Sequence, residues 1–402
     1  MLIRPPTADA FSLPIIAMRL QEPTTSPSAA HDDLRAWLNL TLTTGVGPRT
    51  QQQLLRAFGH PGAVFEAGLS AISGVVGIKS AQNLLEGPRQ EAQQALIDQT
   101  LTWLNEPGHH LITLADQDYP QRLLESTDPP SLLYVNGDPA YLNQPAIGVV
   151  GSRNATPQGV ENARAFSKAL ADAGFSIISG LALGIDAAAH EGALRSDTRS
   201  GTVAVVGTGI DRVYPASNKK LAHLITGNGC IISEFPLGTV AAASNFPRRN
   251  RLIAGLGQAC LVVEAAPASG SLITARLAGE LGRDIFAIPG SIHAPQYKGC
   301  HALIKQGAKL VECAQDILEE LQPRRPAPTI TVVSAIEADN NTTRPEHAAL
   351  LQALGHEAAT LDQLIQRCGL TADVVLAMLT ELSLAGFVTN LPGGRFQRLI
   401  RA

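Results

Sequence analysis

The chain has 402 residues, of which 45% are hydrophobic and 16% charged, and its formal net charge is −4. This length predicts two or three domains, and the apolar content excludes a globally disordered protein. Aromatic residues make up only 4% of the chain, so any stacking against a ligand has to come from few rings or from arginine.

Cysteine usage and hydropathy favour a cytoplasmic protein. The cysteines are far apart and form no CxxC pair, which is typical of reduced, buried thiols and gives no metal site. No apolar run approaches the ~20 residues of a membrane helix. The first residues lack a convincing cleavage site, so neither a membrane segment nor a secretory signal is predicted.

The N-terminal part is predicted to be a disordered extension over residues 1–30, with Met18 as an alternative start, followed by a helical block over 31–135. Asp32-Asp33 fit the capped start of the first helix. TTGVGPRTQQQLLRAFG and SAISGVVGIKSAQNLL both carry a glycine-rich turn before a helix, as in paired helix-hairpin-helix (SAM-like) units. These glycines either offer N–H groups to phosphate or simply close tight turns, and we favour the second interpretation.

The central block, residues 145–322, alternates short Val/Ile-rich runs with amphipathic segments. The strand candidates are AIGVVG, FSIISG, TVAVVG, CIISEF, ACLVVEA, DIFAIPG and AKLVE. Continuous apolar strands are typical of parallel sheets buried on both faces. The block therefore predicts an α/β fold with a doubly wound, Rossmann-like, mostly parallel sheet.

A linker is predicted at 323–345, followed by a small winged-helix-like domain over 346–402. Three amphipathic helices there end in GFVTNLPGGRFQRL, which fits a glycine-turned β-hairpin. The recognition-type helix that Leu370-Thr371 would open carries Asp373 and Glu381 and no Lys or Arg. Protein contacts or a structural role suit it at least as well as reading the major groove.

Ligands of open α/β sheets bind beyond the carboxyl ends of the strands, where several loops of this chain gather glycines, hydroxyls and cations. The candidate binding residues are Gly151, Ser152, Arg153, Ser179, Gly180, Gly184, Lys219, Asn245, Phe246, Arg248, Arg249, Asn250, Arg251, Ser269 and Gly270. Each loop alone fits ordinary turn chemistry. Together, on one edge of one sheet, they predict a phosphate-binding surface.

Several other kinds of site are not supported. The glycines do not follow the GxGxxG spacing, so no nicotinamide cofactor is predicted, and no metal motif or catalytic triad is present. Asp186 fits a helix N-cap, and His190 fits a local hydrogen-bond partner. No catalytic residue, metal or cofactor is therefore assigned.

The ordered segments GVVGSRNAT, SGLALGIDAAAHEGAL, TVAVVGTGIDRVYPASNKKL, SEFPLGT, NFPRRNRLIAGL, VVEAAPASGSLITARLAGELGRDIFAIPGSI and GCHALIKQGA resemble the core of the DNA-processing protein A (DprA, Smf) family. The resemblance implies single-stranded DNA binding, a homodimer formed through the core, and delivery of the strand to the RecA recombinase. In that family this protects incoming DNA during natural transformation. It also implies phosphate contacts at Ser152, Arg153, Ser179, Gly180 and Lys219, and a DNA-gripping loop at 245–251.

The residues alone are also compatible with two other functions. One is a nucleotide hydrolase acting on a ribosyl bond, in which Glu234, Glu264, Asp186 or His190 would be catalytic. The other is an adaptor whose end domains recruit partners. The run RRNR favours a polymeric anion over a mononucleotide, because one phosphate does not need so many cations.

Overall fold

The computed structural model describes residues 27–321, 345–355, 358–391 and 393–399. The predicted extension and linker fall almost wholly outside the described residues. Within them, no helix is long and apolar enough to cross a bilayer.

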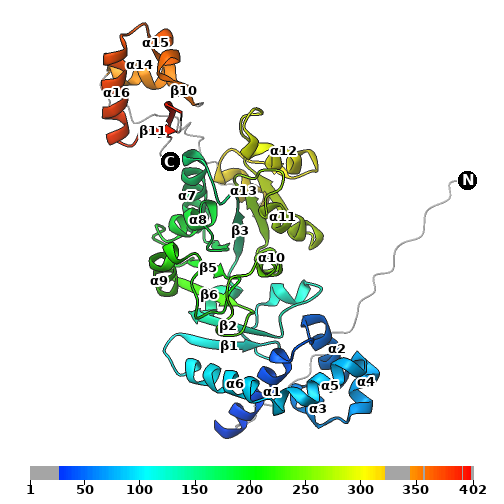
Figure 1. Ribbon diagram of the computed structural model, residues 1–402. Coiled ribbons are helices and arrows are strands. Elements are labelled where there is room, and N and C mark those ends of the chain that lie inside the picture. The colour runs from blue at the N-terminus through cyan, green and yellow to red at the C-terminus, as the bar shows by residue number, and fades with distance from the viewer. Residues whose placement is uncertain (1–26, 322–344, 356–357, 392, 400–402) are drawn as a thin grey trace, which may run out of the picture.

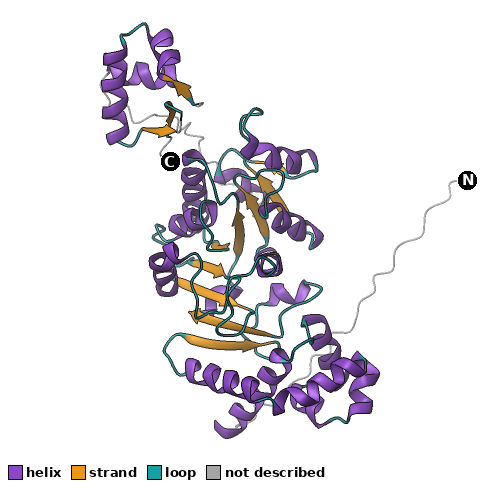
Figure 2. Cartoon of the chain, in the orientation of Figure 1, coloured by secondary structure: helices purple, strands orange, loops and turns teal. Residues whose placement is uncertain are grey.

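A nine-stranded sheet forms the centre of the molecule, in the order β1-β2-β6-β5-β4-β3-β7-β8-β9 (Figures 1 and 2). Its strands are β1 (His109–Thr113), β2 (Leu132–Gly137), β3 (Ala146–Val150), β4 (Ser176–Ser179), β5 (Thr202–Val205), β6 (Gly229–Ser233), β7 (Ala259–Val262), β8 (Asp284–Ala287) and β9 (Lys309–Leu310). Strands β3 to β9 pair in parallel. The predicted doubly wound, mostly parallel sheet is confirmed.

Helices cover both faces of this sheet, because its strands are apolar on both sides. The core helices are α7 (Pro157–Asp172), α8 (Ile185–Ala193), α9 (Lys219–Gly227), α10 (Asn245–Leu256), α11 (Ser271–Glu280), α12 (Lys298–Lys305) and α13 (Ala314–Leu321). On β5, Val203 and Val205 pack in a cluster with α10, α11 and α12, while Ala204 packs toward α9 on the opposite face. Successive strand residues point to opposite faces, so each apolar run builds two cores.

The N-terminal region is helical only as far as Leu104. It contains α1 (Pro27–Leu42), α2 (Pro48–Phe58), α3 (Pro61–Glu66), α4 (Leu69–Val76), α5 (Ile78–Glu86) and α6 (Glu91–Leu104). Asp32 and Asp33 lie inside α1 and do not cap it, which corrects the expected helix start. Strands β1 and β2 then form an antiparallel pair, and β2 joins the central sheet through β6. The end of the block predicted to be helical therefore forms the edge of the sheet.

The C-terminal region has its own apolar core and a winged-helix fold. It comprises α14 (Pro345–Leu354), β10 (Ala359–Thr360), α15 (Leu361–Cys368), α16 (Ala372–Leu384), β11 (Val388–Leu391) and β12 (Arg395–Arg398). Thr360 caps α15 in a reciprocal capping box with Gln363, and β11 and β12 form the predicted hairpin. The predicted winged-helix domain is confirmed.

A groove at the switch point of the sheet

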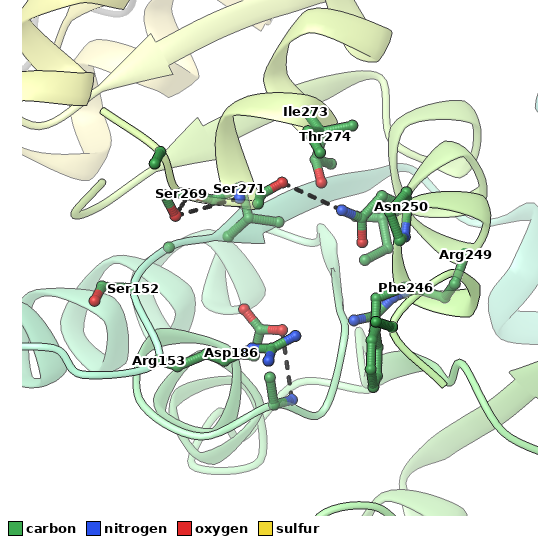
Figure 3. A pocket seen from close by; sticks show the side chains of 18 of the residues that line it. Ser152, Arg153, Asp186, Phe246, Arg249, Asn250, Ser269, Ser271, Ile273 and Thr274 are labelled. Carbon is green, nitrogen blue, oxygen red and sulfur yellow. Dashed lines mark hydrogen bonds between the residues drawn. The ribbon is translucent and has the colours of Figure 1, made fainter. Parts of the chain in front are cut away.

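The chain order along the sheet reverses between β3 and β7, and a groove of about 820 Å³ opens beyond the carboxyl ends of these strands. Such a switch point is where doubly wound sheets bind ligands. The groove is lined by Val150, Gly151, Ser152, Arg153, Asn154, Ala182, Asp186, Tyr214, Ala241, Ala243, Phe246, Pro247, Arg249, Asn250, Ile253, Ala266, Ala268, Ser269, Gly270, Ser271, Ile273 and Thr274 (Figure 3).

Close packing of two loops sets the shape of the groove wall. The Ile185 N–H donates to the Ser152 carbonyl at 3.1 Å, which ties the loop after β3 to the start of α8. Gly184 has φ +75°, and a Cβ there would lie 2.3 Å from the Ser152 oxygen. Only glycine suits that backbone, so Gly184 is explained by loop packing.

The rim of the groove (Ser152, Arg153, Tyr214, Phe246 and Ser269) combines hydroxyls, one free cation and two rings. The Arg153 guanidinium lies 5.0 Å from the centroid of Phe246, and the Tyr214 and Phe246 rings are 5.8 Å apart. Arg153 and Tyr214 are exposed. This surface offers a flat cation and an aromatic face side by side, an arrangement that suits both phosphates and bases.

Three helices begin at the groove, and their N-termini add positive potential. The second turn of α10 and the start of α11 are joined by a hydrogen bond from Asn250 Nδ2 to the Gly270 carbonyl at 3.2 Å. Gly184 and Gly270, the N-cap residues of α8 and α11, provide no side-chain cap. The N–H groups of Ile185 and of residues 271–273 are already hydrogen-bonded to neighbouring oxygens, so it is the helix dipoles that favour anions at these positions.

The floor (Asp186 and Arg249) is a buried charged layer. Arg249 donates to the Gly180 carbonyl at 2.6 Å and to the Val205 carbonyl. Burial lowers the pKa of Arg249 to about 10, while Asp186 opposes that change. Burial also raises the pKa of Asp186, against the effect of Arg249. Two opposite charges thus compensate each other in a largely desolvated part of the groove.

His190, which is on α8 with Asp186 but outside the groove lining, is a buried neutral imidazole. The Thr202 hydroxyl donates to the Ile177 carbonyl at 2.6 Å and therefore accepts from His190 Nδ1, at 2.7 Å. Burial, and to a lesser extent Arg249, lowers the pKa of His190 to about 3. His190 is thus the local hydrogen-bond partner that its position in the sequence suggested. Asp186, expected as an N-cap, is instead the second residue of α8.

The structure brings about half of the predicted site residues into the groove. These are Gly151, Ser152, Arg153, Phe246, Arg249, Asn250, Ser269 and Gly270. Its lining does not include Ser179, Gly180, Gly184, Lys219, Asn245, Arg248 or Arg251. Direct contact of any of them with DNA stays a prediction.

Several residues outside the lining have internal roles. Ser179 Oγ donates to the Val149 carbonyl at 2.7 Å, and Asn245 Nδ2 donates to the Gly207 carbonyl at 3.1 Å. Arg251 is paired with Glu234 and donates to the Asp128 carbonyl at 2.7 Å. Their polar groups hold the loops of the site in place.

The sequence analysis missed Tyr214 and Asn154 as lining residues. Both lie in loops that directly follow predicted strands, one after TVAVVG and one after AIGVVG. The rule that placed Arg153 at the carboxyl edge therefore applied to them equally.

Glu264, one of the candidate catalytic carboxylates, has a structural role. It is fully buried and accepts from the Thr156 N–H at 2.9 Å, from the Thr156 hydroxyl, and from the Tyr297 hydroxyl at 2.9 Å. Among the four acid–base candidates, only Asp186 lines the groove. The groove lining therefore contains a single carboxylate, that of Asp186.

The fold and groove define a class: a doubly wound α/β protein with a groove at the switch point of its sheet. Residues 110–322 match the family model for DNA recombination-mediator protein A, and residues 335–394 match the DprA winged helix domain. The chain belongs to this DprA (Smf) family.

Individual relatives cover most of the molecule. The chain is 42% identical to Protein Smf of Escherichia coli K12 over 332 residues, covering 81% of this chain and 85% of that protein. It is 44% identical to the DNA processing protein DprA of Streptococcus pneumoniae over 210 residues, covering 52% of this chain and 73% of that protein. The X-ray structure of the S. pneumoniae protein superposes with a TM-score of 0.63 at 35% identity, covering 72% of this chain and 97% of that chain.

Proposed function

We propose that this protein binds single-stranded DNA in the switch-point groove and takes part in DNA processing during transformation. The observation that carries the proposal is the convergence of three helix N-termini with the exposed Arg153–Phe246 stack in one groove. The N-termini and Arg153 suit phosphates, and the Phe246 and Tyr214 rings suit unpaired bases. A paired duplex would hide its bases from these rings.

The distribution of charge also supports a polynucleotide. The chain is acidic overall, yet Arg153 and Arg248 are exposed at the carboxyl edge of the sheet. A confined basic edge gives a salt-dependent grip on a phosphate backbone without making the whole surface basic.

Membership of the family extends the proposal beyond the groove. On that basis the protein protects incoming strands in the cytoplasm, loads RecA onto them, and acts as a homodimer. The dimer surface is sought in residues 284–321, where Ile292 and Leu310 are exposed apolar side chains. Exposed apolar residues of this kind are typical of subunit interfaces.

The alternative is hydrolysis of a ribosyl bond. Asp186 is its strongest candidate, because this carboxylate lines the groove and burial raises its pKa. A carboxyl group with a raised pKa can act as a general acid. Incubation with nucleoside monophosphates, followed by detection of released base, tests this alternative. Released base that disappears in Asp186→Asn would favour the enzyme over the binding protein.

The proposal is tested by salt titration of oligo-dT binding, followed by fluorescence anisotropy, for the wild type and an Arg153→Ala/Arg248→Ala variant. We expect tight wild-type binding that weakens steeply with salt. The double variant should bind at least about tenfold more weakly, and its log–log salt slope should be smaller by about 1.4, because each phosphate contact on a single strand contributes about 0.7.

Arg276→Ala is the matched control, because Arg276 is an exposed arginine of α11 whose partner is Glu280 on the same helix. It should bind like the wild type. Salt-independent wild-type binding, or a double variant with unchanged affinity, would mean that DNA does not occupy this groove.

A further inference from the structure

A second cavity, of about 410 Å³, lies between the N-terminal helices and the central sheet. Its walls are the α1–α2 turn at Gly45–Gly47, the first turn of α2, the start of β2 with Ser131, and the segment after β6 with Glu234. Arg248 of α10 completes the lining. The volume falls within the range of small-ligand sites.

Three buried polar atoms of the lining residues have no hydrogen-bond partner within the described part of the chain. They are Glu234 Oε1, Ser131 Oγ and the Tyr134 hydroxyl oxygen. The Glu234 side chain is only 4% exposed, and its other oxygen is taken by Arg251. An unpaired buried acceptor costs about 1–3 kcal/mol, more when it is charged. An unpaired carboxylate oxygen and an unpaired hydroxyl, both in residues that line the cavity, fit a ligand that carries an N–H donor beside an acceptor.

The opposite wall is suited to an anion. Helix α2 begins at Pro48, and its N-cap Gly47 provides no side-chain hydrogen bond. Pro48 has no N–H, and the Gln51 N–H donates to the Gly47 carbonyl. The first-turn donors without a partner within the helix are therefore the N–H groups of Arg49 and Thr50. The helix dipole adds partial positive charge there. The Arg248 side chain is 52% exposed and its guanidinium stacks on Phe235 at 4.9 Å. Its pairing with Glu234, at 3.8 Å, leaves donors available.

The cavity and the switch-point groove share helix α10. Phe246, Arg249 and Asn250 of this helix line the groove, whereas Arg248 lines the cavity. Residues of one helix turn point in different directions, so the first turns of α10 form the partition between the two spaces. A polymer bound in the groove can continue over α10 toward the cavity without leaving the protein surface.

We propose that this cavity is a second nucleotide subsite, in which Glu234 and Ser131 bind a base while the N-terminus of α2 and Arg248 bind its phosphate. The inference rests on the proposed function, because the nucleotide is part of the strand held in the groove. Each of the four bases offers an N–H donor beside an acceptor on its pairing edge, so the subsite tolerates any sequence. The N-terminal helices thereby become part of the DNA-binding surface.

The decisive variant is Gly47→Asp in the full chain, with oligo-dT binding and thermal unfolding as readouts. A Cβ at Gly47 meets no atom within 4 Å, and the backbone there is extended, with φ −81°. Aspartate is a favoured N-cap, so the variant should be at least as stable as the wild type. Its carboxylate occupies the α2 donors and repels phosphate, so affinity for a long oligonucleotide should fall about tenfold.

Gly68→Asp is the matched control. Gly68 is the uncapped N-cap of α4, has φ −73°, is equally open around its Cβ, and does not line the cavity. It adds the same charge to the same region and should leave DNA affinity unchanged. Equal affinities of the two variants would overturn the subsite, and so would equal affinity of Gly47→Asp and the wild type.

Ser131→Ala tests whether the Ser131 hydroxyl binds the nucleotide or only packs within the protein. If the hydroxyl only packs, its removal relieves an unpaired buried group and leaves DNA binding unchanged, which contradicts the proposal. We expect unchanged unfolding and several-fold weaker binding of the long oligonucleotide. Free dTMP is the second probe: binding of dTMP that Gly47→Asp abolishes, with oligonucleotide affinity untouched, would overturn the strand assignment. Failure of the wild type to bind DNA at all would instead reject the proposed function.

Discussion

The rim and the floor of the switch-point groove use charge in opposite ways. On the rim, Arg153 is exposed and stacks on Phe246, with no carboxylate recorded as its partner in the described structure. In the floor, Arg249 is buried, and its Nη1 donates to two backbone carbonyls beside Asp186. A desolvated charge of this kind supports the loops and contributes little to the capture of a ligand. The number of cations that a bound strand can contact therefore depends on how many arginines are solvent-accessible, and not on how many the sequence contains.

The largest effect that this comparison predicts is on stability, for Arg249→Ala. Removing the guanidinium leaves Asp186 buried without its compensating charge and frees the Gly180 and Val205 carbonyls. We expect a loss of about 3–5 kcal/mol in the free energy of unfolding, measured by urea denaturation. Arg153→Ala is the control and should change it by less than about 0.5 kcal/mol. A stable Arg249→Ala protein would show that the floor is not structural.

A second, smaller effect concerns the pH dependence of stability, through His190. Burial holds its folded-state pKa near 3, below the ordinary value of 6.5. Between these values the unfolded state binds one more proton, so this residue makes the folded state lose about 1.4 kcal/mol of stability per unit as pH falls from 6.5 toward 3. Stability above pH 6.5 is unaffected by this proton.

His190→Gln tests that slope, because glutamine does not titrate. Its free energy of unfolding, measured at several pH values between 6 and 4, should fall less steeply than that of the wild type, by about 1.4 kcal/mol per pH unit. Subtracting the wild-type curve removes the contributions of Asp186 and Glu234, whose raised pKa values act in the opposite direction. Parallel curves would mean that His190 is charged in the folded state.

The sequence predicted the sheet well where strands are continuous apolar runs. Strands β3 to β7 are buried along their whole length and lie in such runs. Strands β8 and β9 were predicted from similar runs, although β8 is partly exposed and β9 is exposed at the edge of the sheet. Strand β1 was missed because it begins with His109 and His110, which are only half-buried at the edge of the sheet. Edge strands carry polar residues, so periodicity gives them no clear signal.

The sequence predicted the location of the binding site better than the role of each residue in it. The run RRNR (residues 248–251) predicts a cluster of free cations. In the structure, however, Arg249 is buried and bonded to backbone carbonyls, and Arg251 is paired with Glu234. The helical register contained part of the answer: Arg249 is spaced with Leu252, Ile253 and Leu256 on the buried face of α10. The pairing of Arg251 with Asp128 could not be predicted, because it joins residues far apart in the chain.

The smallest effect that we predict concerns the winged-helix domain, which belongs to neither the rim nor the floor. Helix α16 carries Asp373 in its first turn and no Lys or Arg, so its N-terminus repels phosphates that a recognition helix would attract. The domain also has its own apolar core around Leu379. A chain ending at residue 344 should therefore bind oligo-dT within about twofold of the full-length affinity, a difference of less than ~0.5 kcal/mol, as measured by anisotropy. A tenfold loss would show instead that the arginines of β12, Arg395 and Arg398, act together with Arg153 on the same strand.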